Sequence, residues 1–286
     1  MWKKIKEITQ DGIPFFFGAP VLVWQALFLF VPLLLIIGLS IIHRDAAGLY
    51  RISLEPIVWF MQPMYWRILV WSGWLALFTA VTCLVISYPI SYIIAFKAGR
   101  FKVPLLFLLI VPFWTNFLLH VYAWFYVLER GGFLNTILLK IGLISEPLRV
   151  LNSVHATGIM MIYSYLPFMI LPLYAVFDRF DVELIEASMD LGASWWQTVR
   201  KIIIPQTFTG IVSGFFLVFI PAFAEFAIPE LMGGDRRMFV GTVISQYMLG
   251  ALTIVRGAAF TLLSSLVLSV YVVVIYYFMR GIVKRL

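Results

Sequence analysis

Six stretches of the chain are long and apolar enough to cross a membrane as helices, and no other feature constrains the fold as strongly. A helix needs about 20 mostly apolar residues to cross the hydrocarbon core of a bilayer. The stretches cover roughly residues 20–42, 68–96, 103–128, 154–177, 203–232 and 257–279. The alternation typical of barrel strands is absent, so we expect an all-α fold: a polytopic membrane helical bundle with six transmembrane helices.

The composition agrees with a protein that has lipid as part of its solvent. Hydrophobic residues make up 63% of the 286 residues and charged residues 12%, whereas soluble domains contain about 25% charged residues. The net charge of +7 could indicate nucleic-acid binding, but the cations lie between apolar runs and not among exposed aromatics. We therefore expect one transmembrane domain over residues 1–286, in contact with lipid and not with nucleic acid.

The first apolar stretch could also be the core of a cleaved signal peptide, because Lys3, Lys4 and Lys6 precede it. However, residues 20–42 are longer than the apolar region of a signal peptide, and no small-residue cleavage pattern lies near their end. We interpret the stretch as a retained first span. A lone cysteine, Cys83, lies in the second stretch and is expected to be inert packing.

Lysine and arginine in the loops predict the orientation. Six spans place both termini on one side, which then carries 12 of these cations against nine on the other. Lysine alone is distributed seven to one. Both termini are therefore predicted to be cytoplasmic, and so is the loop at residues 178–206.

This cytoplasmic loop begins with an acidic helix. Five of the 14 acids lie between residues 178 and 190. If 181–191 is helical, Glu183, Glu186 and Asp190 share one face. Asp178 or Asp181 can cap the N-terminus of this helix.

A turn and a second helix follow. Gly192 tolerates the positive φ that ends many helices. Ser194 can cap a second helix, which is predicted to run through Arg200 and Lys201 into the fifth span, with Pro205 near the membrane surface. An interfacial helix held by lipid is the alternative, but such helices carry basic polar faces, and an acidic face favours a protein partner.

The same residues resemble a known motif. Glu186-Ala187-Ser188, then Gly192 and then Ile204-Pro205 resemble the EAA loop of ABC-importer permeases, with Ser188 where the family has a second alanine. In that family the loop forms a coupling helix that sits in a cleft of the cytoplasmic ATPase. The resemblance implies that coupling to an ATPase involves six residues: Glu186, Ala187, Ser188, Asp190, Gly192 and Pro205.

The resemblance extends over most of the chain. Residues 105–128, 163–181 and 217–234 look like the permease subunits of spermidine/putrescine importers, especially the putrescine-type first permease. Iron, sulfate and thiamine permeases share the loop but are less similar elsewhere. The resemblance implies a type I ABC importer permease in a bacterial inner (plasma) membrane. The implied partners are two copies of an ABC ATPase, a different second permease and a periplasmic or extracellular binding protein.

ATP hydrolysis is assigned to the partner. The chain contains no G-x-x-x-x-G-K-[ST] loop, so it is expected to be a transport subunit and not an enzyme. No His/Cys cluster indicates a metal site. ATP and Mg²⁺ would be bound by the ATPase, and this chain itself would bind no cofactor.

Two acids near the end of the fifth stretch are candidates for contact with substrate. An ionisable residue within the membrane is costly, so Glu225, between Pro221 and Pro229, is a functional candidate. Glu230 lies nearer the outer end. A carboxylate suits a protonated amine, and aromatic faces attract cations. The aromatic candidates are Trp114, Tyr122, Trp124, Tyr163 and Tyr165. Packing is the alternative for each aromatic, and a pair with a sister-subunit cation for Glu225.

Other polar features have simpler interpretations. Asn116 and His120 are expected to hydrogen-bond to a neighbouring helix. Residues 133–143 have helical spacing with a stop at Gly142, and are too short to span.

Two other functions are less well supported by the sequence than an ABC permease. A secondary transporter would place paired acids or basic relays deep in several spans, and an intramembrane protease would need paired aspartates, a Ser/His site or an HExxH helix.

Overall fold

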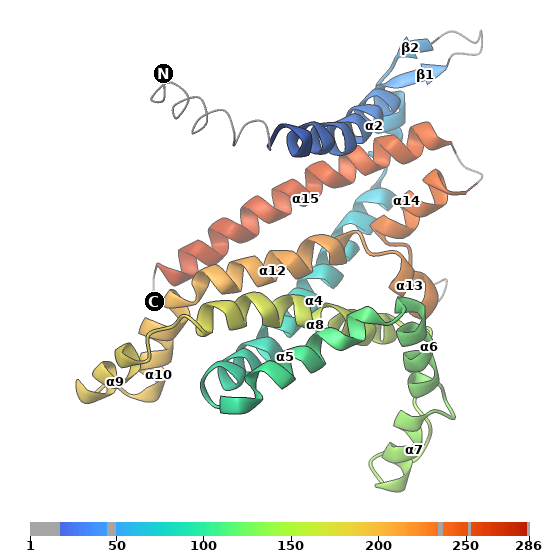
Figure 1. Ribbon diagram of the computed structural model, residues 1–286. Helices are drawn as coiled ribbons and strands as arrows, with labels where there is room; N and C mark the ends of the chain where they lie inside the picture. Colours follow the sequence, from blue (N-terminus) through green and yellow to red (C-terminus); the bar gives the residue numbers. More distant parts are fainter. Residues whose placement is uncertain (1–17, 45–49, 234–236, 251–252, 285–286) are drawn as a thin grey trace, which may run out of the picture. The chain divides into compact units, whose positions relative to one another are not determined.

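The structure is a computed structural model, and it describes residues 18–44, 50–233, 237–250 and 253–284 (Figure 1). These residues are almost entirely helical. The one sheet among them is an antiparallel hairpin of β1 (Ile42–Arg44) and β2 (Tyr50–Ile52), in which His43 pairs with Arg51. Apart from this short hairpin, the expected all-α architecture is confirmed.

The helices vary from single turns to 34 residues, and several apolar stretches are divided among more than one of them. In chain order they are η1 (Ala26–Phe30), α2 (Val31–Ile41), α3 (Glu55–Trp59), α4 (Pro63–Phe96), η2 (Gly99–Phe101), α5 (Lys102–Ile110), η3 (Val111–Trp114), α6 (Phe117–Leu128), α7 (Phe133–Lys140), α8 (Val154–Phe177), α9 (Glu183–Asp190), α10 (Trp195–Thr198), η4 (Val199–Ile203), α11 (Ile204–Gln206), α12 (Phe208–Phe223), α13 (Ala227–Met232), α14 (Val240–Met248) and α15 (Ile254–Val283).

Contacts group the chain into two units, Met1–Gln62 with Gln246–Leu263 and Pro63–Ser245 with Ser264–Leu286. In the described part of the first unit, Phe60 packs against Tyr247 and Phe260, with ring centroids 5.6 and 4.9 Å away. The second unit contains every candidate residue named above. The single transmembrane domain over residues 1–286 stays a prediction.

Three long helices, α4, α8 and α12, lie side by side and form the core of the second unit (Figure 1). Two glycines four residues apart bring α12 close to α8. A Cβ added at Gly214 would lie 2.8 Å from the Met169 sulfur, and one at Gly210 would lie 3.0 Å from the Pro172 carbonyl oxygen. Small residues at this spacing are typical of close helix packing in membranes. At the interface between α4 and α8, Ser91 of α4 donates a hydrogen bond to the carbonyl of Ile170.

Four helical stretches have the length and hydropathy of a span, and they correspond to four of the six predicted ones: Gly18–Ile41, Pro63–Phe96, Val154–Phe177 and Ile254–Val283. The fifth predicted stretch is broken. Its two segments, Trp195–Gln206 and Phe208–Phe223, meet at 66°. They reach the length and hydropathy of a span only when they are taken together. The second helix of the loop at residues 178–206 was predicted to run into the fifth span, and the structure adds a bend where the two segments meet.

The third predicted stretch, 103–128, is divided into α5 and α6, and neither is long enough to span alone. Pro112 lies in the 3₁₀ turn η3 between them. Asn116 then begins α6 by accepting a hydrogen bond from the Leu118 N–H at 2.8 Å. Asn116 was expected to bond to a neighbouring helix, but a helix that restarts needs an acceptor for its free N–H groups. The count of six spans thus remains a prediction.

Candidate functional site

The acidic helix predicted in the loop at residues 178–206 is present. It is α9, Glu183–Asp190, and the Asp181 carboxylate accepts a hydrogen bond from the Glu183 N–H at 3.0 Å. Gly192 follows it with φ of +82°, in the left-handed region where a side chain is unfavourable. The predicted helix and turn are confirmed, because both depend on residues within one or two turns of them. The N-cap position itself is Val182, so Asp181 satisfies the first N–H of α9 from one residue earlier.

The second helix also starts where the sequence indicated. The Ser194 N–H donates to the Gln197 side chain at 2.8 Å, and the Ser194 hydroxyl accepts from the Gln197 N–H at 3.4 Å. This is a capping box. The helix then widens into the π turn η4, continues through Pro205 in α11 and ends at Thr207, where the chain bends. The Thr207 hydroxyl lies 3.0 Å from the hydroxyl of Tyr88 on α4.

The motif residues of α9 point in two directions. Glu186, Ala187 and Asp190 are exposed, and neither acid forms a side-chain hydrogen bond or ion pair within the described part of the chain. Ser188 is buried and its hydroxyl lies 2.8 Å from the hydroxyl of Thr198 on α10. Ser188 therefore joins the two helices of the loop and is not part of the exposed surface of α9.

The apolar side of α9 attaches the loop to the core helices. Ile185 of α9 and Ile203 of η4 are buried in one cluster with Ala95 of α4 and Phe177 of α8. The aromatic rings of Tyr88, Tyr92 and Phe96 surround this cluster. Packed side chains therefore connect α9 to the ends of α4 and α8.

One exposed ion pair borders the same region. The Lys102 ammonium at the start of α5 lies 3.2 Å from an Asp178 carboxylate oxygen, and that oxygen also accepts a hydrogen bond from the Tyr174 hydroxyl at 3.0 Å. The hydrogen bond from Lys102, followed by that from Tyr174, lowers the pKa of Asp178 from its ordinary value. Asp178 is thus engaged here, while Asp181 accepts the hydrogen bond from the Glu183 N–H at the start of α9.

The second candidate site is centred on Glu225, between α12 and α13. One carboxylate oxygen accepts hydrogen bonds from the N–H groups of Phe226 and Ala227, both at 3.0 Å. The other accepts a 2.7 Å hydrogen bond from the hydroxyl of Tyr165 on α8. Two of the predicted candidates, Glu225 and Tyr165, are therefore in direct contact.

Gly241 supports this break in the helix, and sequence reasoning missed it. A Cβ at Gly241 would collide with the Ala224 carbonyl oxygen and come within 2.8 Å of the Glu225 backbone. The start of α14 also accommodates the hydroxyl of Ser72 on α4, which accepts from the Val240 N–H at 2.9 Å. Nothing in the local sequence around Gly241 indicates these contacts, because the atoms it meets are 16 or more residues away.

The remaining aromatic candidates are only partly brought together. Tyr163 of α8 packs edge-on against Trp124 of α6 at 5.4 Å and tilts toward His120 at 5.8 Å. His120 and Tyr163 help to line a cavity of about 120 Å³. His120 Nε2 lies 2.9 Å from the Thr115 hydroxyl, a partner close in sequence and not on a neighbouring helix as expected.

Three other candidates lie apart from these contacts. Trp114 and Tyr122 are 75% and 55% exposed, and Trp114 packs edge-on against Phe107 at 5.8 Å. Glu230 is exposed in the first turn of α13. A cation or a lipid could reach all three from outside the chain, so their position does not single out a shared binding site.

Comparison with known families decides what kind of protein carries these sites. Residues 87–286 match the family described as the inner-membrane component of binding-protein-dependent transport systems. The chain belongs to this family. It is thus a permease subunit of an ABC importer, a transport component and not an enzyme.

Two relatives of this permease are similar over nearly their whole length. The spermidine/putrescine transport system permease protein PotB of Escherichia coli strain K12 is 38% identical over 253 residues, which cover 88% of this chain and 92% of that protein. PotB of Haemophilus influenzae is 36% identical over 258 residues, covering 87% and 89%.

A solved structure agrees with the fold. A chain of a bacterial alginate ABC transporter, in complex with an alginate pentasaccharide-bound periplasmic protein, superimposes with a TM-score of 0.68 at 16% identity. The superposition covers 98% of this permease and 96% of that chain. At this identity the likeness supports the fold alone.

Proposed function

We propose that this permease forms part of the membrane path of an ABC importer for polyamines, putrescine or spermidine. The observation that carries the proposal is the 38% identity, over 88% of the chain, to permeases named for spermidine and putrescine transport. The position of Glu225 is chemically consistent with it, because a carboxylate is a natural partner for a protonated amine.

The carboxylate of Glu225 has an acceptor position left for such a partner. A carboxylate has about four acceptor positions on its two oxygens, and three are used by Phe226, Ala227 and Tyr165. No cationic side chain in the described part of the chain pairs with it. A substrate ammonium would therefore add a bond to a carboxylate that is already fixed in place, and would lose no protein contact by binding.

Coupling to ATP hydrolysis would use α9. Its exposed acids, Glu186 and Asp190, form a surface that a cleft on a cytoplasmic ATPase would bind, and the buried cluster around Ile185 connects this surface to α4 and α8. Closure of two ATPase subunits on ATP and Mg²⁺ would push α9 and reorient the spans. This requires that the loop and both termini are cytoplasmic, as the lysine distribution favours.

The complete transporter would contain four kinds of subunit. They are this permease, a different second permease, two copies of the ATPase, and a soluble binding protein that delivers substrate to the outer face. The second permease would supply the opposite wall of the path.

Uptake tests this proposal directly. Cells without their own polyamine importers would express this chain with its partner subunits, and accumulation of radiolabelled putrescine and spermidine would be measured. We expect saturable uptake that stops when the ATPase is inactivated. An assembled complex that hydrolyses ATP but takes up neither amine would contradict the polyamine assignment and leave a permease for another small solute.

A further inference from the structure

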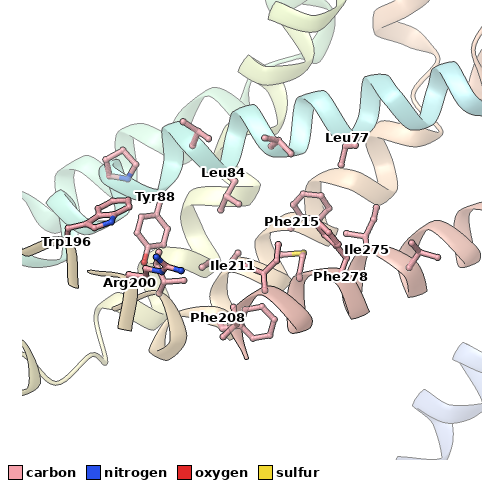
Figure 2. Close-up of a pocket in the computed structure, with 18 residues that line it drawn as sticks. Leu77, Leu84, Tyr88, Trp196, Arg200, Phe208, Ile211, Phe215, Ile275 and Phe278 are labelled. Atoms are coloured by element: carbon pink, nitrogen blue, oxygen red, sulfur yellow. The ribbon is translucent and has the colours of Figure 1, made fainter. Parts of the chain in front are cut away.

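A deep apolar groove runs along the second unit between α4, α12 and α15 (Figure 2). Its volume is about 910 Å³, within the roughly 300–1,000 Å³ of pockets that hold small ligands. Leu84, Ile211 and Phe215 are typical of its walls, and Arg200 is the one charged residue among the described residues that line it.

The charged and amphipathic groups lie together at one end. Arg200, Trp196 and Tyr88 are grouped there, while Leu77, Phe215 and Ile275 lie toward the other end (Figure 2). Arg200 is exposed and forms no ion pair within the described part of the chain. Tryptophan and arginine side chains are favoured at the headgroup level of a bilayer, where one part of the side chain is apolar and another is wet.

The length of the groove matches one leaflet. Along α4 it extends from Leu77 to Pro89, which is about 18 Å at the helical rise of about 1.5 Å per residue. The hydrocarbon core of a bilayer is about 30 Å thick, so one leaflet accounts for about 15 Å. The groove is about as long as one leaflet is thick, and it has a cation at one end only. Its apolar walls and single charged end therefore match the acyl chains and the headgroup of one phospholipid molecule.

We propose that the groove binds the acyl chains of an anionic phospholipid from the cytoplasmic leaflet, with the lipid phosphate on Arg200. The proposal rests on the cytoplasmic position of the coupling loop in the proposed function, because Arg200 lies in η4 of that loop. The bound lipid contacts α4, α12 and η4 at once, so it fills the space beside the bend through which the loop joins α12.

Lipid retention by the assembled transporter tests this site. The purified complex of permease, second permease and ATPase is incubated with equal amounts of phosphatidylglycerol and phosphatidylethanolamine with identical acyl chains, and bound lipid is counted by native mass spectrometry. Arg200→Gln is compared with Lys201→Gln, which removes the same charge one residue away at an exposed side chain that does not line the groove.

We expect Arg200→Gln to reduce retained phosphatidylglycerol about fivefold, the effect of one cation near an anionic surface, and Lys201→Gln to leave it unchanged. Val85→Trp places a bulky side chain in the groove from an exposed position, and should reduce retention of both lipids. It decides the question if the Arg200→Gln complex does not assemble.

Three results would overturn the proposal. The first is an equal loss of phosphatidylglycerol with Arg200→Gln and Lys201→Gln. The second is full lipid retention by both Arg200→Gln and Val85→Trp. The third is release of the second permease by Val85→Trp without loss of lipid, which would make the groove a subunit interface. Polyamine uptake is measured in parallel. Selective lipid retention without polyamine uptake would contradict the proposed substrate and support the lipid site.

Discussion

The helices are interrupted on both sides of α12, and the carboxylates near the two interruptions have opposite environments. Before α12, the acids of α9 are exposed and unpaired within the described residues, while the turn is closed by Gly192 and the Ser194 capping box. After α12, the carboxylate of Glu225 is itself the cap and is bonded to three donors.

This difference separates two kinds of functional acid. An exposed acid that has no internal partner contributes little to the fold, and its charge is available to another protein. An acid that closes a break inside an apolar region is required by the fold first, because unsatisfied N–H groups in a membrane are costly. Substitutions of the exposed acids of α9 should therefore affect coupling alone, whereas those at Glu225 should affect both substrate contact and local structure.

The largest effect is expected at the α9 turn. Gly192→Val should abolish transport, because a β-branched residue at φ of +82° costs at least about 1–2 kcal/mol and would rotate α9 away from α10. Uptake and ATPase co-purification measure it. Gly192→Asn is the matched control, since asparagine tolerates the left-handed region and a Cβ there meets no other atom within 4 Å. Equal loss in both variants would contradict a backbone cause.

The next effect is expected at the second interruption. Glu225→Gln removes the charge and keeps one oxygen as an acceptor, so assembly with the ATPase should persist. The apparent KM for polyamine uptake should rise at least about tenfold, since a hydrogen bond to a charged group contributes about 1.5–3 kcal/mol. Unchanged uptake kinetics would exclude Glu225 as a substrate contact. Glu230→Gln, at an exposed position without the Tyr165 contact, is the comparison.

A smaller effect should follow from loss of the groups that hold Glu225. Tyr165→Phe removes the 2.7 Å hydrogen bond and retains the ring, so KM should rise less than with Glu225→Gln while the maximal rate changes little.

Gly241→Ala introduces the Cβ that collides with Ala224, and overpacking of this kind costs about 1–3 kcal/mol. Thermal unfolding in detergent should show a lower Tm for Gly241→Ala than for Tyr165→Phe. The reverse order would argue against Gly241 as the support.

The smallest effect is expected at the ion pair of Lys102 and Asp178. The folded-state pKa of Asp178 is lowered from 3.8, so the pair stabilises the fold at pH values above this and the contribution is lost as the pH falls through the folded-state pKa. At neutral pH an exposed pair contributes little. Lys102→Met should leave uptake and Tm almost unchanged at pH 7, and the difference from wild type should disappear in acid. A large loss of activity at pH 7 would indicate a role in coupling.

The same contrast explains what could be predicted from the sequence. The α9 loop could be predicted residue by residue, because caps, turns and faces depend on near neighbours: Asp181, Gly192 and Ser194 all behave as local rules require. The contact between Glu225 and Tyr165 could not, because it joins residues 60 apart. Both were candidates by residue type, but only the packing of α12 on α8 shows that they meet.

Other features depend on interactions that the sequence does not display. The stretch 103–128 satisfies a hydropathy rule and stays a predicted span, while its division at Pro112 and the Asn116 cap is not indicated by hydropathy. The position of Pro205 near the membrane surface stays a prediction. The 66° bend two residues later, at Thr207, follows a π turn that no composition rule indicates. The coupling role of Ser188, implied by the motif, stays a prediction, and its burial against Thr198 became apparent only from the fold.

The most direct test of the account is a site-specific crosslink from α9 to the ATPase. Ala187 is exposed and the adjacent Ser188 is buried, and the native Cys83 is buried as well. In the assembled transporter, a short photoactivatable crosslinker on Ala187→Cys should join the permease to the ATPase, and Ser188→Cys should give no adduct. An assembled complex in which Ala187→Cys fails to crosslink to the ATPase would contradict α9 as the coupling helix.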